Sequence, residues 1–420
     1  MKRLIIVTLV GLFAVPITSF AGTATSRWDL TLGGYIKFDM GYSSQGVNAD
    51  YSKASRASYG SYENSADEYG SLFAAGGETR LNFRINGPDA WGAKTMGFVE
   101  GDFRGQSSAG DYGEFSLRHA YMRLKWTSDA LTIGHTWQKW GYLPNHSGIM
   151  LGAGMLTAYN RGSRQPQIMW DHDFNKNVGL SLGIASPTNT LGSRTIDDFN
   201  YSGYPFLEGE LKYTSDACGK IGSWQTLFTV SGFYGWERKI YDANPDPAIT
   251  TYDDSLERAW GLALKGYMPV IPERKGNKTG ALGISGKIFM SQNPSWYMGS
   301  FALGAYNRGS SINPDYSYPR LFGAQGHVSY WLTNNLFITG YCGQMRYTVS
   351  DRYKTMNRNA IQREDQYIVN LSYDINQAMR VGIEWDYIKT KYANYSAATV
   401  PFFDNYGKMH AFRIGAWYFF

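Results

Sequence analysis

Hydrophobic and polar residues alternate along most of this chain. In Leu117–Trp126, for example, every second residue is polar or basic and the residues between them are largely apolar. A period of two is the side-chain period of a β-strand. A soluble sandwich turns the apolar face toward a core, whereas a membrane barrel turns it toward lipid and its polar face toward a water-filled lumen. This segment taken alone leaves both architectures open.

The same rhythm continues to the C-terminus and predicts about sixteen strands. They are expected at Trp28–Tyr42, Thr79–Asn86 and Ala93–Arg104, three within 117–170, and then near 178–187, 205–215, 223–238, 256–268, 279–292, 319–332, 335–348, 364–374, 378–392 and 407–420. Short breaks such as 127–130, 174–177, 333–334 and 375–377 alternate with long ones, near 43–77, 140–163, 188–204, 239–255, 293–318, 349–363 and 393–406. Short turns at one end and long loops at the other are typical of outer-membrane barrels.

The long break after Trp137 carries little charge and several apolar residues (Ile149, Met150, Leu151, Met155 and Leu156). A loop of this length inside a β-protein is usually either functional or disordered. Its composition does not suit a solvated tail. We therefore expect it to fold into the mouth of the barrel and narrow it.

The N-terminus has the pattern of a secretory signal peptide. Lys2 and Arg3 precede an apolar run from Leu4 to Val15, and small residues follow at Ser19 and Ala21. The apolar run is shorter than the ~20 residues that a spanning helix needs. We expect residues 1–21 to be removed on export and residues 22–420 to form a single transmembrane β-barrel domain in the outer membrane of a Gram-negative cell.

Composition agrees with an exported β-protein. Phe, Trp and Tyr make up 16% of the chain, which holds 32 Tyr and 48 Gly, and such residues favour strands and turns over helices. Without Lys2 and Arg3 the count is 38 basic against 35 acidic residues, a net charge of +3. This near balance gives no electrostatic reason to expect a nucleic-acid partner.

No sequence motif indicates a cofactor, a metal or an enzyme. CxxCH, CxxC, HExxH and Walker-type motifs are all absent, and the two cysteines, Cys218 and Cys342, are too sparse to form a disulfide framework. His135, His172 and His410 show no ligand spacing. We therefore expect no metal, no cofactor and no catalysis.

The last strand favours the membrane barrel over the sandwich. Read back from Phe420, every second residue through Phe412 is apolar or aromatic. A chain that ends in Phe with this alternation resembles the C-terminal strand of bacterial outer-membrane proteins, which their assembly machinery reads.

With these segments identified, the chain resembles a bacterial outer-membrane porin, and in particular the DcaP-like porins. The matching segments are Gly33–Asp39, Thr79–Pro88, Val99–Gly105, Leu117–Leu124, Leu131–Trp137, Arg164–Ile168 and Val328–Gly340. The resemblance implies a sixteen-stranded, trimeric, water-filled channel for small hydrophilic solutes, often organic anions, with an inward-folded loop. Its expected partners are these solutes, outer-membrane lipid and lipopolysaccharide. Met169 is a departure, because such proteins are expected to have a lumen-facing Arg there.

Alternation predicts the charged residues that line the lumen. They are Arg80, Arg84, Glu100, Asp102, Arg104, His119, Arg123 and Lys125. Five cations against two carboxylates leave +3 with His119 neutral, and rings of charge are a recurrent device for selectivity. We expect a mild preference for anions such as small carboxylates. The alternative is that each residue belongs to an ion-pair ladder on an ordinary hydrated wall.

Two other functions use a similar fold. A barrel that sheathes a multihaem cytochrome would also lack CxxCH, but it needs a lumen wide enough for a protein and no inward loop. An outer-membrane hydrolase needs a Ser–His or acid–His constellation, and nothing in the sequence marks one. The aromatic residues Trp137, Trp140 and Tyr142, at the start of the long loop, either stack on a solute or pack the loop against the wall, and we favour packing.

Overall fold

The computed structural model describes residues 28–45, 70–106, 112–141, 164–186, 202–242, 252–292, 320–348, 361–392 and 406–420. The predicted signal peptide and most of the long loop after Trp137 lie outside this described part. The strands are β1 (Asp29–Ser43), β2 (Ser71–Ala75), β3 (Arg80–Asn86), β4 (Lys94–Gln106), β5 (Tyr112–Lys125), β6 (Asp129–Trp137), β7 (Arg164–Asp173), β8 (Val178–Ala185), β9 (Phe206–Ile221), β10 (Trp224–Asp242), β11 (Tyr252–Ile271), β12 (Leu282–Gln292), β13 (Arg320–Trp331), β14 (Leu336–Thr348), β15 (Ile361–Asp374), β16 (Met379–Tyr392) and β17 (Tyr406–Phe419). No helix among the described residues is long and apolar enough to cross a membrane.

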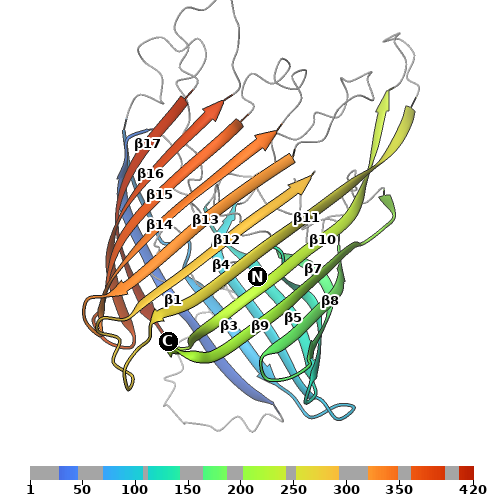
Figure 1. Cartoon of the computed structure of the whole chain (residues 1–420), viewed down its shortest axis with the longest axis horizontal. Helices are drawn as coiled ribbons and strands as arrows, with labels where there is room; N and C mark the ends of the chain where they lie inside the picture. Colours follow the sequence, from blue (N-terminus) through green and yellow to red (C-terminus); the bar gives the residue numbers. More distant parts are fainter. Residues whose placement is uncertain are drawn as a thin grey trace, which may run out of the picture.

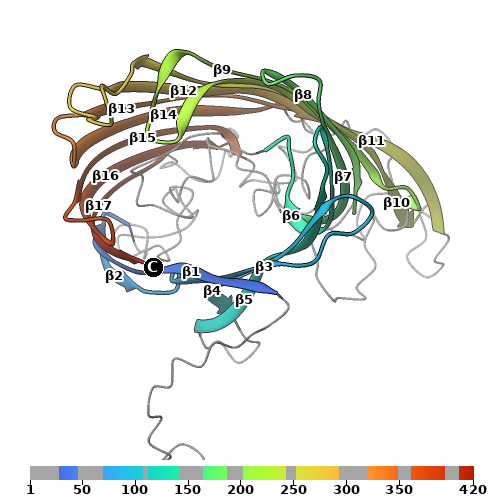
Figure 2. The same cartoon turned by 90° about the horizontal axis from the view of Figure 1, so that it is seen from below.

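The strands form one antiparallel wall that closes on itself (Figures 1 and 2). From β3 onward each strand pairs with the next one in sequence, and β1 closes the ring by pairing with β17 over Tyr35–Ser43. On its other edge β1 pairs with β3 over Asp29–Tyr35 and with β2 over Asp39–Ser43. Both edges of β1 are therefore occupied.

β2 and β3 lie end to end along β1, so seventeen elements make a wall of sixteen strands. This confirms the predicted all-β barrel and its strand number. The sequence predicted β3 to begin at Thr79 and placed the residues of β2 in a loop. β2 was missed because residues 76–79 separate it from β3, and its five residues are too few to show a clear alternation.

The two faces of the wall reverse the pattern of a soluble protein. On β1, Ile36 and Phe38 are 56% and 50% exposed on the outer face, whereas Lys37 and Asp39 are 4% and 8% exposed on the inner face. A band of exposed apolar side chains continues around the barrel, for example Phe412 and Ile414 on β17. An apolar band outside and charge inside suit a barrel surrounded by lipid.

Three of the short turns at one end of the barrel are closed by the same pair of side-chain hydrogen bonds. In the β7–β8 turn, Asn175 Oδ1 accepts from the backbone N–H groups of Asn177 and Val178 at 2.8 and 3.0 Å. Asn376 between β15 and β16 and Thr333 between β13 and β14 make the same pair of bonds. These side chains close tight turns by replacing backbone acceptors, which explains why the sequence located the turns well.

Gly34 sits where the ring closes. Its N–H donates to the Phe420 carbonyl at 3.1 Å and its carbonyl accepts from Phe420 N–H at 3.2 Å. Its φ of 153° is unusual for other residues, and a Cβ would lie 2.1 Å from the backbone oxygen of Arg80. Only glycine lets β1 approach β3 and the C-terminus this closely.

We predict that Gly34→Ala destabilises the closed barrel, because the added methyl group collides with the backbone of β3. Strain of this kind costs about 1–3 kcal/mol. Urea unfolding in lipid vesicles, followed by the loss of heat-modifiable electrophoretic migration, should show a lower midpoint. Gly340→Ala is the matched control, because a Cβ there would meet no atom within 4 Å. Equal midpoints for both variants would contradict the prediction.

Candidate functional site

The inner face near β4 and β5 holds a buried cluster of charges. Arg118 Nε donates to Glu100 Oε1 at 2.8 Å, and its Nη1 donates to Asp102 Oδ2 at 2.6 Å. The Arg118 and Asp102 side chains are only 5% and 3% exposed. One guanidinium therefore forms ion pairs with two carboxylates, so each of these buried charges has a charged partner.

A β-bulge turns Arg118 inward. Glu100 lies opposite His119 and Gly101 lies opposite Leu117, so Arg118 is the extra residue of β5. Regular alternation would put Arg118 on the outer face with Ala120, which is why it is missing from the predicted lining. A bulge changes the face that a side chain points to, and nothing in the local sequence marks one here.

Glu78 is a second lining residue that sequence analysis missed. It lies in the 76–79 interruption, where Thr79 N–H donates to the Gly76 carbonyl at 3.0 Å. Its carboxylate forms ion pairs with Lys37 and, at 2.9 Å, with Arg104 Nη1. Lys37 also pairs with Asp39 at 2.9 Å. The interruption between β2 and β3 thus places the Glu78 carboxylate on the inner face, between the cations of Lys37 and Arg104.

The eight predicted lining residues all belong to the inner face, but they divide into two groups. Glu100, Asp102, Arg104 and Arg123 form ion pairs, and His119 Nδ1 lies 3.0 Å from Thr136 Oγ1. Those without a carboxylate partner among the described residues are Arg80, Arg84 and Lys125. The wall therefore holds both ion-paired charges and, among the described residues, three cations without a carboxylate partner.

The chain turns into the barrel directly after β6. Lys265 Nζ on β11 donates to the Lys139 carbonyl at 2.5 Å, and Lys287 Nζ on β12 donates to the Gly141 carbonyl at 2.7 Å. The Trp140 N–H donates to Glu208 Oε1 on β9 at 2.8 Å. We call residues 138–141 the inward segment. Its bonds to inner-face residues of β9, β11 and β12 confirm that the loop starts inward, while residues 142–163 lie outside the described part.

Trp140 anchors the inward segment by packing. Its side chain is fully buried, and its ring lies 5.0 Å from that of Phe233 and 5.8 Å from that of Phe289, both edge to face. These rings belong to a buried apolar cluster on the inner face of β8–β14. The favoured interpretation of this tryptophan, packing rather than solute stacking, is confirmed.

A cavity of about 270 Å³ lies between the inward segment and the inner wall of β5–β7. Arg123, Lys139 and Lys265 line it with the carboxylates of Asp171 and Glu210. Asp171 pairs with Arg123 at 3.2 Å and with Lys139 at 3.0 Å, and Lys265 pairs with Glu210 at 2.7 Å. Three cations and two carboxylates leave a net charge of +1.

Met169 also lines this cavity and is 2% exposed. It occupies the inner-face position at which the family resemblance leads us to expect an arginine. Polar side chains surround it, including Thr132 and Gln167. Lys139 and Lys265 reach the same space from the inward segment and from β11, so the cavity contains cations that alternation within β7 cannot reveal.

Sequence comparison does not identify a relative. The chain matches no protein-family profile, and no curated protein is similar to it. Comparison of folds does find neighbours: the barrel has the fold of outer-membrane porins and channels.

One such neighbour is the outer membrane channel DcaP of Acinetobacter baumannii, at 18% identity and a TM-score of 0.67, covering 94% of this chain and 97% of that one. Another is OmpT, an outer membrane protein of Vibrio cholerae, solved in a trimer form, at 13% identity and a TM-score of 0.52, covering 94% and 100%. The resemblance to DcaP-like porins is thus confirmed for the fold. Identity at this level shows the architecture alone.

We predict that Arg118→Met strongly destabilises the barrel, because Glu100 and Asp102 then lose their shared partner in a buried site. Removing one side of a buried ion pair costs about 3–5 kcal/mol, and urea unfolding in vesicles measures it. The triple variant Arg118→Met/Glu100→Gln/Asp102→Asn should recover much of the loss.

Breaking the exposed Lys94–Asp89 pair by Lys94→Met is the control, and we expect almost no change. A midpoint for Arg118→Met equal to that of this control would show that the buried cluster contributes nothing to stability.

Proposed function

We propose that this protein is an outer-membrane porin for passive diffusion of small hydrophilic solutes, with a mild preference for anions such as small carboxylates. The observation that carries the proposal is the cavity beside the inward segment, where three cations face two carboxylates. Its dimensions suit a small solute, and its cations suit a carboxylate. The long loops would face the cell exterior and the short turns the periplasm.

The cations without carboxylate partners support the same preference. Arg80, Arg84 and Lys125 lie on the inner wall formed by β3 and β5, and Arg80 stacks on the ring of Tyr35 at 5.2 Å. Cations that no protein carboxylate neutralises attract mobile anions, and a low-dielectric wall focuses this attraction. Arg118, which is buried against two carboxylates, contributes mainly to stability, whereas the cations of the cavity outnumber its carboxylates by one.

The inward segment argues against the cytochrome sheath. A barrel of sixteen strands leaves an aqueous channel, and here a segment crosses that space to bond with β9, β11 and β12. A protein-sized occupant needs this room. Passive diffusion of small solutes is compatible with a segment that projects inward.

We predict that the purified protein opens ion-conducting pores in planar bilayers. In a salt gradient the reversal potential should indicate mild anion preference, stronger at low ionic strength because salt screens fixed charges. Arg84→Ser/Arg123→Ser should shift the reversal potential toward cations.

Arg346→Ser/Arg363→Ser is the control for that shift, because it removes the same charge from the outer face. Verified folded protein without conductance would refute the channel. Cation preference in the wild type, or equal shifts for both double variants, would refute the role of the inner cations.

We further predict a homotrimer. Support comes from the trimer form of the Vibrio cholerae neighbour and from the prevalence of closed symmetry among homo-oligomers. Native mass spectrometry after detergent removal should give three times the mass of the processed chain. A clean monomer under conditions that preserve channel activity would refute the trimer.

A further inference from the structure

The outer wall of β14–β17 carries two rows of cations near the long-loop end. In the register of the sheet, the first row is Arg346, Arg363, Lys391 and Tyr406, one residue from each strand. The second row, one step nearer the short turns, is Gln344, Asp365, Lys389 and Lys408. Together these rows contain five cations and one carboxylate.

Hydrogen bonds within the rows leave the lysines free of carboxylates. Asp365 Oδ1 accepts from Arg363 Nε at 2.9 Å and from Gln344 Nε2 at 2.7 Å. Lys389 Nζ lies 4.4 Å above the Tyr406 ring, and Lys391 Nζ lies 5.9 Å from it. Neither lysine forms an ion pair with any described residue. The patch is therefore an outward-facing surface of strong positive charge.

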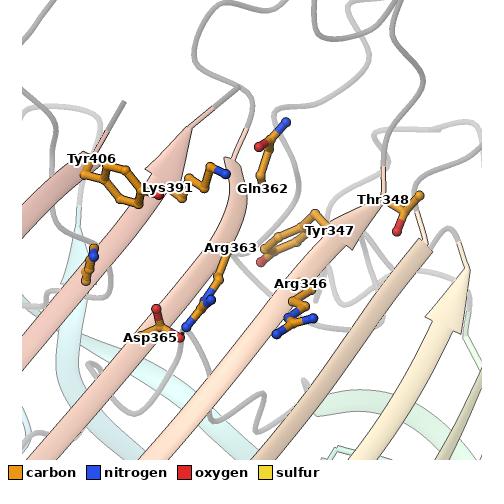
Figure 3. Close-up of a pocket in the computed structure, with 9 residues that line it drawn as sticks. Arg346, Tyr347, Thr348, Gln362, Arg363, Asp365, Lys391 and Tyr406 are labelled. Carbon is orange, nitrogen blue, oxygen red and sulfur yellow. Dashed lines mark hydrogen bonds and ion pairs between the residues drawn. The ribbon is translucent and has the colours of Figure 1, made fainter. Parts of the chain in front are cut away.

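All residues of the two rows except Gln344 and Lys408 line a groove of about 490 Å³ (Figure 3). Arg346, Thr348, Gln362 and Lys391 supply its hydrogen-bond donors, and the groove lies over adjacent strands of the wall. Four strands at about 4.8 Å spacing make the first row about 14 Å wide. That width accommodates an extended anionic group with more than one phosphate.

The third outward-facing row, one step further toward the short turns, indicates the height of the groove relative to the lipid. It consists of Tyr367, Tyr387 and His410, whose rings stack across β15–β17 at 6.2 and 4.7 Å. Beyond it come apolar residues, among them Val369 and Phe412. Tyrosines gather at the boundary between hydrocarbon and headgroups. The cationic rows therefore lie just past that boundary, at headgroup level on the long-loop side.

We propose that this groove binds the phosphate groups of a membrane glycolipid in the leaflet at the long-loop end. Arginine and lysine bind phosphate through charge-assisted hydrogen bonds, and the acyl chains of such a lipid would continue over the apolar band below. A soluble anion would gain no contact from that band. The inference rests on the proposed outer-membrane placement, in which this leaflet contains lipopolysaccharide.

The test measures lipid binding directly by native mass spectrometry of the detergent-solubilised protein. The probes are lipid A with two phosphates, lipid A from which both phosphates have been removed, and inorganic phosphate as competitor. Lys389→Gln/Lys391→Gln should weaken binding of the bisphosphorylated lipid about 10- to 30-fold, from about 1 kcal/mol for each basic residue near a charged membrane surface. The dephosphorylated lipid should bind weakly to both proteins.

The control is Lys176→Gln/Lys275→Gln, which removes two charges from turns at the opposite end and should leave lipid A binding unchanged. If the first variant fails to fold, Arg346→Gln/Lys408→Gln tests the same rows. Equal binding of both lipids, or equal affinity in groove and control variants, would overturn the proposal. Competition by millimolar phosphate that fully replaces the lipid would show a free-anion site instead.

Measuring the conductance of the same variants distinguishes a failure of this proposal from a failure of the proposed porin function. The groove faces outward, so its variants should conduct as the wild type does. If the protein binds lipid A but does not conduct, the porin proposal is refuted and the glycolipid site stands. If it conducts but does not bind lipid A, only the glycolipid site is refuted.

Discussion

Closure of the sheet is the constraint on which the rest of this structure depends. Hydrocarbon offers no hydrogen bonds to unpaired backbone groups, so a membrane sheet must have no free edge. β1 meets that requirement by pairing with β17 on one edge and with β2 and β3 on the other. Once the wall is closed, alternation sends one set of side chains to lipid and the other to the interior. The buried charges follow from this geometry, because the interior receives every polar position.

The enclosed charges have two roles that depend on whether a partner is near. Arg118 and Lys37 each contact two carboxylates and are almost fully enclosed. Such groups fix neighbouring strands to one another and offer little net field to a solute. Arg84 and Lys125 have no such partner among the described residues, so no carboxylate there offsets their charge on the inner face. The net charge summed over the lining residues is therefore a poor guide to selectivity. A better guide is which of the cations have a carboxylate partner.

Much of the fold could be predicted because alternation and turn chemistry are local properties. The strand end at Tyr392 was predicted to the residue, and Asn175, Thr333 and Asn376 directly mark the short turns at 174–177, 333–334 and 375–377. The candidate site was predicted less completely. Arg118 depends on a bulge in register, and Glu78 depends on an interruption between two strands. Lys265 and Lys287 reach the site from distant strands. Each of these features depends on how separate segments pair in space. The alternation of residues within one strand carries no information on that pairing.

The inward segment also has a consequence for the order of assembly. Lys139 and Gly141 bond to residues that follow them by 126 and 146 positions in the chain. Contacts of such long range form late, because a large loop must close before they bring any gain. Among the early strands, β7 holds this segment through the Lys139–Asp171 ion pair. Its remaining anchors on β9, β11 and β12 become available only when those strands have joined the wall, so the segment takes its final position late in assembly.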